Sequence, residues 1–152
     1  MDIQTLIRHL APQWHYKSPG ASDATLDDIQ VCMSVRLPDD YRNLLKWSNG
    51  GATVLPSVVA RKIEVVFWPA EKIVDMNRDY EIQHYLGSQL LAFGDDGGDH
   101  HFVLDFRKNE GPPSIAAVPG GDLCDESIRK LAESFLEFME KALKGQIDEA
   151  TI

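Results

Sequence analysis

The sequence is poor in cysteine: it has two, Cys32 and Cys124, and neither belongs to a closely spaced pair. We therefore expect neither a disulfide framework nor a structural zinc site. Long apolar runs are also missing, because Arg61, Lys62 and Glu64 interrupt the most hydrophobic stretch, so no transmembrane helix is expected. The first residues have neither the basic start nor the apolar centre of a signal peptide. We therefore expect a cytoplasmic protein without a membrane partner, with both thiols reduced and near the core.

Basic residues are scarce as well: 15 Lys and Arg stand against 24 Asp and Glu, which gives a net charge of −9. Direct binding of nucleic acid is therefore not expected, because phosphate recognition needs clustered Lys and Arg. The imbalance is concentrated late in the chain, since residues 1–76 carry −1, residues 77–152 carry −8, and the window 95–126 carries −6. Such an acidic surface either keeps the protein soluble or steers a basic protein partner, and composition leaves both interpretations open.

The patterns that are present predict one domain over residues 1–152, a normal size for a domain. Apolar residues at helical spacing predict helices at 2–10, 22–35, 37–51 and 69–80. Alternating patterns predict strands at 63–67, 88–93, 100–106 and 113–119.

Helical spacing returns near the end of the chain. There Asp125 would cap one long helix that ends at Gly145, and residues 146–152 would form a frayed tail. Because short turns join the strands, we predict an α+β fold with a largely antiparallel sheet, packed with N-terminal and C-terminal helices on one side.

The stretch FGDDGGDHHFVLDF, residues 93–106, gathers Asp and His around a pair of glycines. Asp99-His100-His101 matches a short string of one phosphoesterase family, and two-metal hydrolysis uses ligands of that kind. However, neighbouring residues of a strand point to opposite faces, so His100 and His101 would not share one metal. A metal-dependent hydrolase centred on Asp99 and His101 is therefore the least favoured hypothesis.

The same stretch fits a hairpin better. Its two glycines, Gly97 and Gly98, supply positive φ, and Asp95 or Asp96 can accept hydrogen bonds from the turn. It does not fit a calcium loop, whose sixth position must be glycine and whose twelfth must be acidic. No nucleophile motif or phosphate loop is present, so we assign no catalytic, cofactor-binding or metal-binding residue and expect no cofactor.

Three segments together resemble the SUKH superfamily, specifically its Smi/Knr-like branch. They are LPDDYRNLLKWSNGG (37–51), LLAFGDDGGDHHFVLDF (90–106) and LAESFLEFM (131–139). Where members of this family often have Glu and Gly, this chain has Gln30 and Ser34. The residues that match the family's motifs, which we interpret as structural, are Leu37, Pro38, Tyr41, Asn49, Gly50, Gly51, Gly94, Gly98 and Asp99.

The resemblance implies an α+β fold and a non-catalytic immunity protein, an intracellular binder that neutralises a bacterial toxin, often a nuclease. A regulatory scaffold of the same fold is the alternative that it also implies. Nuclease toxins have basic clefts, so an acidic surface would associate with them quickly. The helix after Pro69 is a second candidate interface. The first candidate for the partner-binding surface is the acidic loops, with Asp95, Asp96, Glu110, Asp122 and Asp125.

Overall fold

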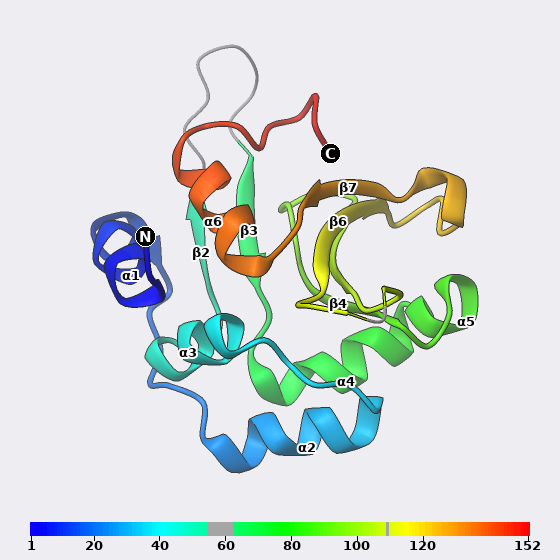
Figure 1. The fold of residues 1–152 in the computed structure, drawn as a ribbon, viewed down its shortest axis with the longest axis horizontal. Coiled ribbons are helices and arrows are strands. Elements are labelled where there is room, and N and C mark those ends of the chain that lie inside the picture. The colour runs from blue at the N-terminus through cyan, green and yellow to red at the C-terminus, as the bar shows by residue number, and fades with distance from the viewer. Residues whose placement is uncertain (55–62, 109) are drawn as a thin grey trace.

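Seven antiparallel strands, paired in chain order, organise the part of the chain that the computed structural model describes, residues 1–54, 63–108 and 110–152 (Figure 1). The strands are β1 (Trp14–His15), β2 (Gly51–Val54), β3 (Glu64–Phe67), β4 (Leu90–Asp95), β5 (His100–Asp105), β6 (Ser114–Pro119) and β7 (Arg129–Ala132). The predicted α+β class and antiparallel sheet are therefore confirmed. The first two strands were not predicted, because each is short and begins inside or directly beside a helix-breaking stretch.

Helices surround the sheet on more than one side, which differs from the one-sided cover that we expected. The helices of the described residues are α1 (Ile3–Leu10), α2 (Asp23–Met33), α3 (Asp39–Trp47), α4 (Ala70–Asp79), α5 (Ile82–Leu86) and α6 (Phe135–Leu143). The first, third and sixth pack together, and α6 contacts β6 and β7. In contrast, α4 and α5 lie along β4, and α2 packs against α4 from outside (Figure 1).

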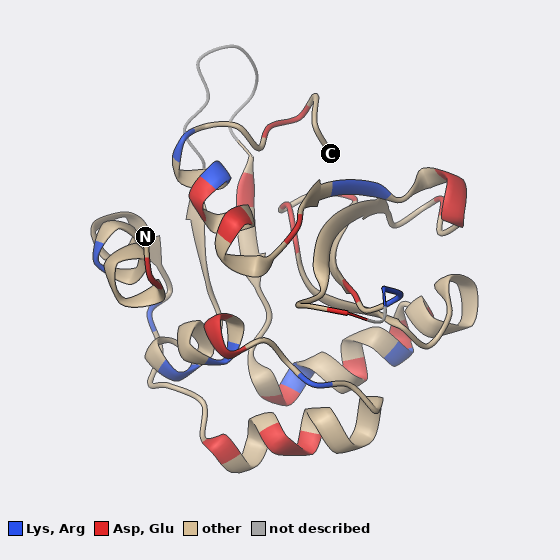
Figure 2. Cartoon of the chain, viewed as in Figure 1, with Lys and Arg blue, Asp and Glu red and all other residues tan. Residues whose placement is uncertain are grey.

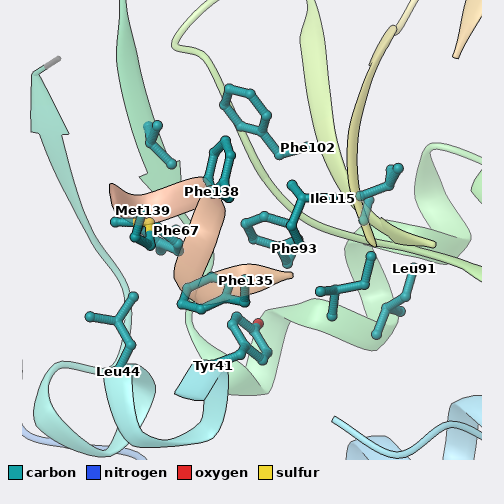
Figure 3. Close-up of a cluster of buried hydrophobic side chains, with 14 of the residues drawn as sticks. Tyr41, Leu44, Phe67, Leu91, Phe93, Phe102, Ile115, Phe135, Phe138 and Met139 are labelled. Atoms are coloured by element: carbon teal, nitrogen blue, oxygen red, sulfur yellow. The ribbon is translucent and has the colours of Figure 1, made fainter. Parts of the chain in front are cut away.

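Aromatic rings fill the space between the sheet, α3 and α6 (Figure 3). The ring centroids of Tyr41 and Phe135 lie 5.4 Å apart in an edge-to-face arrangement. Phe102 on β5 lies 5.4 Å from Phe138 on α6, and Phe93 lies 5.6 Å from Tyr41. Such pairs add about 0.5–1.5 kcal/mol each beyond the burial of their area. All five side chains are essentially inaccessible to solvent, so this aromatic cluster is the centre of the core.

A buried asparagine completes β4 where its neighbour β3 ends. The two strands pair only at Val66–Asp95 and Phe67–Gly94, so Ala92 lacks a strand partner on that edge. Asn77 of α4 replaces it: the Asn77 amide donates to Ala92 O at 2.8 Å, and Ala92 N–H donates to Asn77 Oδ1 at 2.9 Å. This side chain therefore satisfies two backbone groups that burial would otherwise leave unpaired.

The prediction of one long helix over residues 125–145 is wrong. Residues Asp125–Ser127 form a single 3-10 turn, the chain then extends into β7, and α6 begins only after Ser134. The Ser134 hydroxyl accepts from Glu137 N–H at 3.2 Å, and Glu137 accepts from Glu133 N–H at 2.7 Å. The two bonds form a variant of the capping box in which the return bond comes from the residue before the N-cap, and they mark where the extended segment ends and the helix starts.

The C-terminal segment 146–152 does not fray as expected. Ile147 is 1% exposed and belongs to the core. Asp148 accepts hydrogen bonds from the N–H groups of Ala150 and Thr151, which closes a turn. Its burial and its turn therefore tie this segment to the domain.

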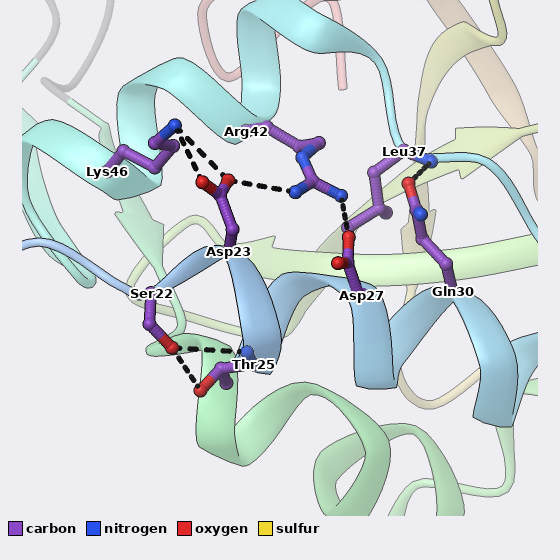
Figure 4. Close-up of polar contacts among 8 residues, drawn as sticks. All are labelled: Ser22, Asp23, Thr25, Asp27, Gln30, Leu37, Arg42 and Lys46. Carbon is purple, nitrogen blue, oxygen red and sulfur yellow. Dashed lines mark hydrogen bonds and ion pairs between the residues drawn. The ribbon is translucent and has the colours of Figure 1, made fainter.

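Side-chain contacts fix the junction between α2 and α3, and Figure 4 shows those made by Gln30 and Arg42. Gln30 Oε1 accepts from Leu37 N–H at 3.0 Å, which fixes the chain as it leaves α2. Ser34 ends α2 with φ +53°, a left-handed conformation that favours glycine. Arg42 of α3 then reaches Asp27 at 2.8 Å and Asp23 at 3.0 Å. The backbone at Ser34 is therefore one that glycine would adopt more easily than serine does.

The two cysteines are more exposed than the sequence led us to expect. Cys32 lies on the exposed side of α2, and Cys124 is half-buried beside Ser127. Both are unpaired, as the sequence predicted, but neither is in the core. None of the helices in the described ranges combines the length and apolar character needed to cross a membrane.

Candidate protein-binding surface

The first two carboxylates of the β4–β5 turn, Asp95 and Asp96, accept hydrogen bonds from groups in or beside the hairpin. Asp95 accepts from Trp68 Nε1–H at 2.9 Å and from Gly97 N–H at 2.8 Å. Asp96 accepts from Gly98 N–H at 2.9 Å and from His100 N–H at 3.1 Å. The Asp96 side chain is only 10% exposed. The predicted turn capping is therefore present, and these two carboxylates hold the hairpin instead of projecting from it.

The two histidines of the hairpin point to opposite faces, as strand alternation predicted. His100 Nδ1 lies 3.0 Å from Asp99 and 3.5 Å from Asp96. These three residues could bring one ligand atom each within 4.8 Å of one another. His101, in contrast, is buried against Trp68 and lies outside that group. The pairing of Asp99 with His101 that the hydrolase hypothesis required is thus replaced by a pairing with His100.

A cluster of three rings lies behind the turn. Tyr80 at the end of α4 lies tilted against His101 with centroids 4.6 Å apart, and it stacks on Trp68 with centroids 6.0 Å apart. Burial lowers the pKa of His101, and the nearby carboxylates of Asp95 and Asp96 offset this only partly. His101 Nδ1 has no hydrogen-bond partner among the described residues. Burial in this aromatic setting therefore favours the neutral form of the imidazole.

The other predicted interface residues lie on separate loops. Glu110 is exposed between β5 and β6. Asp122 and Asp125 are exposed on the β6–β7 loop, together with Glu126, and Figure 2 shows acidic residues at the tip of this loop. Asp122 accepts from the Ser127 hydroxyl at 2.5 Å, which stiffens the loop. The structure thus separates the five predicted residues into two internal turn caps and three exposed carboxylates.

One basic side chain reaches across to the β6–β7 loop. Arg107 lies 2.8 Å from Asp105 and 3.6 Å from Asp125. Although burial works against ionisation, the Arg107 guanidinium holds the pKa of Asp105 below its ordinary value. Asp125 remains 69% exposed despite this contact. The loop therefore keeps most of its negative charge in solvent.

The residues that match the family motifs lie at helix ends, in turns and in the core, with one exception. Asn49 Oδ1 accepts from Ala70 N–H at 2.7 Å and anchors the start of α4. A side chain at Gly51 would collide with the Trp14 indole, and one at Gly94 would collide with Val66 O.

Leu37 and Tyr41 are buried in the core. Pro38 is the N-cap of α3, Gly50 has φ +86°, and Gly98 lies in the turn. Asp99 is the exception, since it is 85% exposed.

Several surface residues were missed from the sequence. Tyr80 and Tyr85 are both exposed at the junction of α4 and α5. The local pattern gave no sign of α5, because a helix of five residues is too short to show a period. The helix predicted after Pro69, over residues 69–80, was the one sequence pattern that pointed to this region.

A comparison with family models gives one match. The SMI1 / KNR4 family (SUKH-1) model matches residues 20–141, which run from just before α2 into α6. The match leaves out α1 and β1. None of the curated proteins compared with the chain matches it.

Proposed function

The chain belongs to the SMI1 / KNR4 family (SUKH-1), and from this premise we propose that it is a non-catalytic, cytoplasmic immunity protein. It would neutralise a bacterial toxin by direct protein–protein binding. The partner that its charge fits best is a basic toxin domain, such as a nuclease whose cleft holds phosphate.

The observation that supports this proposal is the exposed acidic loop between β6 and β7. Asp125 and Glu126 project at its tip, and the internal bond between Ser127 and Asp122 holds the loop in place. Exposed carboxylates on a stiff loop raise the rate of association with a basic partner, because the attraction acts before contact. Asp95 and Asp96 contribute to this field, although their oxygens already accept hydrogen bonds from the turn.

The test uses the polypeptide encoded beside this chain's gene. The two proteins are co-expressed in a bacterial host, and growth is compared with expression of the neighbour alone. Restored growth together with a stable complex supports the immunity proposal. A stable complex without restored growth would favour a regulatory scaffold instead.

The role of the loop is tested by association kinetics. The double variant Asp125→Asn with Glu126→Gln should slow association about tenfold at low salt, and the difference should shrink as salt screens the charges. The matched control is Asp28→Asn with Glu149→Gln, which removes two exposed carboxylates elsewhere. Equal association rates for the two double variants would contradict the assignment to this loop.

A further inference from the structure

The corner where α4 meets α5 exposes two aromatic rings. Tyr80 is 46% exposed and Tyr85 is 55% exposed, and they are two of the five large hydrophobic side chains that are exposed in the described ranges. The corner lies on the same side of the molecule as the β6–β7 loop, opposite α1 (Figure 1). Exposed Tyr is common at the centres of protein–protein interfaces.

The ring of Tyr80 is held in place before any partner arrives. One face of Tyr80 packs on Trp68 and His101. The Tyr85 ring lies edge-to-face with His84, with centroids 4.7 Å apart. Aromatic side chains that are already fixed lose little conformational entropy when they bind.

A strained residue stands between the two tyrosines. Glu81 has φ +56°, a left-handed conformation that costs a residue with a side chain about 1 kcal/mol or more. Its side chain is exposed, and no Lys or Arg of the described ranges lies within 4 Å of it. Glu81 therefore presents a carboxylate that makes no ion pair with the residues the structure describes, at a position where glycine would be easier to accommodate.

Beside Glu81 lies a hollow of about 380 Å³ between α2 and α4. Met33 and Val74 line it with apolar surface, and Glu81 and His84 lie at its α5 side. Arg78 also lines it, but Asp75 at 3.2 Å and Asp79 at 3.4 Å offset that charge. An apolar wall next to a carboxylate matches an arginine side chain, which has an aliphatic stem and a charged planar end.

We propose that this hollow takes an arginine side chain of the basic protein partner. The stem would lie over Met33 and Val74, the guanidinium would pair with Glu81, and apolar neighbours of that arginine would pack on Tyr80 and Tyr85. This proposal rests on the proposed function, because both require a basic partner. It adds a second site, on different elements from the acidic loop, and gives that site the short-range contacts that slow dissociation.

The test does not need the natural partner. A blocked Leu-Arg-Leu tripeptide is titrated into the ¹⁵N-labelled full chain, and a blocked Leu-citrulline-Leu tripeptide of the same shape but no charge is the control. The arginine peptide should shift the amide signals of Glu81, His84 and Tyr85, and the citrulline peptide should bind about fivefold more weakly. Glu81→Gln should remove this difference, whereas Glu110→Gln, at another exposed carboxylate, should preserve it.

Two outcomes would overturn the inference. One is that the shifts appear only in the β6–β7 loop, and the other is that Glu81→Gln binds both peptides as the unchanged chain does. Neither outcome touches the immunity proposal, which depends on protection of growth. If the chain does not restore growth in the co-expression test, the peptide titration still shows whether the hollow beside Glu81 binds arginine.

Discussion

Replacing Asn77 by alanine should destabilise the fold far more than the loss of one polar side chain usually does. The Asn77 amide is fully buried and hydrogen-bonded to both backbone groups of Ala92, to Ile73 O at 2.8 Å and to Gln83 Nε2 at 3.0 Å. The substitution leaves the N–H and C=O of Ala92 buried without partners. Each such group costs about 1–3 kcal/mol, so we expect a total loss of about 3 kcal/mol.

This loss is large compared with the whole stability of a domain, which is about 5–15 kcal/mol. For a chain of this length it corresponds to a fall in Tm of about 6–12 °C. Asn77→Leu should cost at least as much, because the leucine fills the space that water could otherwise enter. Urea unfolding followed by circular dichroism and by tryptophan fluorescence measures the free energy of unfolding and checks that the transition remains two-state.

Two controls make the result specific. Gln4→Ala, at an exposed position of α1, should change the free energy of unfolding by less than about 0.5 kcal/mol. Gln83→Ala removes the bond to Leu90 O at 2.7 Å, and its effect should not add to that of Asn77→Ala, because the two side chains share one network. A loss below about 1 kcal/mol for Asn77→Ala would refute the argument that this amide substitutes for a strand.

Three further predictions concern pH, helix capping and backbone strain. Because burial lowers the pKa of His101, the unfolded chain takes up a proton that the folded chain resists, so stability should fall as pH drops from about 7 to 5. His101→Phe should flatten this part of the curve and His15→Gln should not, whereas parallel curves for the two variants would contradict the assignment. Ser134→Ala should lower the free energy of unfolding by about 1 kcal/mol, because it removes the N-cap of α6. Asp125→Ala should lower it by less than about 0.5 kcal/mol in the same urea unfolding measurement. The reverse order would place the start of the helix at residue 125. Ser34→Gly should raise the free energy of unfolding by about 0.5 kcal/mol, since glycine accepts the left-handed backbone; a loss of stability would show that the serine side chain contributes there.

Local patterns predicted those elements whose signals lie within a few residues. The helix predicted at 22–35 contains α2, which Ser22 caps by accepting from Thr25 N–H. The strand β5 lies within its predicted stretch, and β4 overlaps the predicted stretch 88–93 and continues to Asp95. The C-terminal error has the same origin. Leu131 and Ala132 have the spacing of a helix, but pairing with β6 holds them in a strand, and that pairing depends on residues distant in sequence. The Ser134–Glu137 capping box was the local signal that marked the true start of the helix.

The candidate surface was predictable in charge but not in shape. The sequence showed that residues 95–126 are acidic, yet only the structure shows that Asp96 faces its own turn while Asp125 faces solvent. The α4–α5 corner depends on the packing of Tyr80 over His101, two residues on different elements. Contacts of this kind follow from tertiary packing, so no window of sequence contains them.

The chain-order pairing of the strands also has a consequence for synthesis on the ribosome. Each strand from β2 to β7 finds its partner in the strand made just before it, so the sheet can assemble as the chain emerges. Tyr41 of α3 covers part of the aromatic face formed by Phe93 and Phe102, and the rest of that face is covered only when α6 adds Phe135 and Phe138. A nascent or truncated chain that stops before residue 135 would therefore leave part of this aromatic face exposed, and the addition of α6 is the step that buries it.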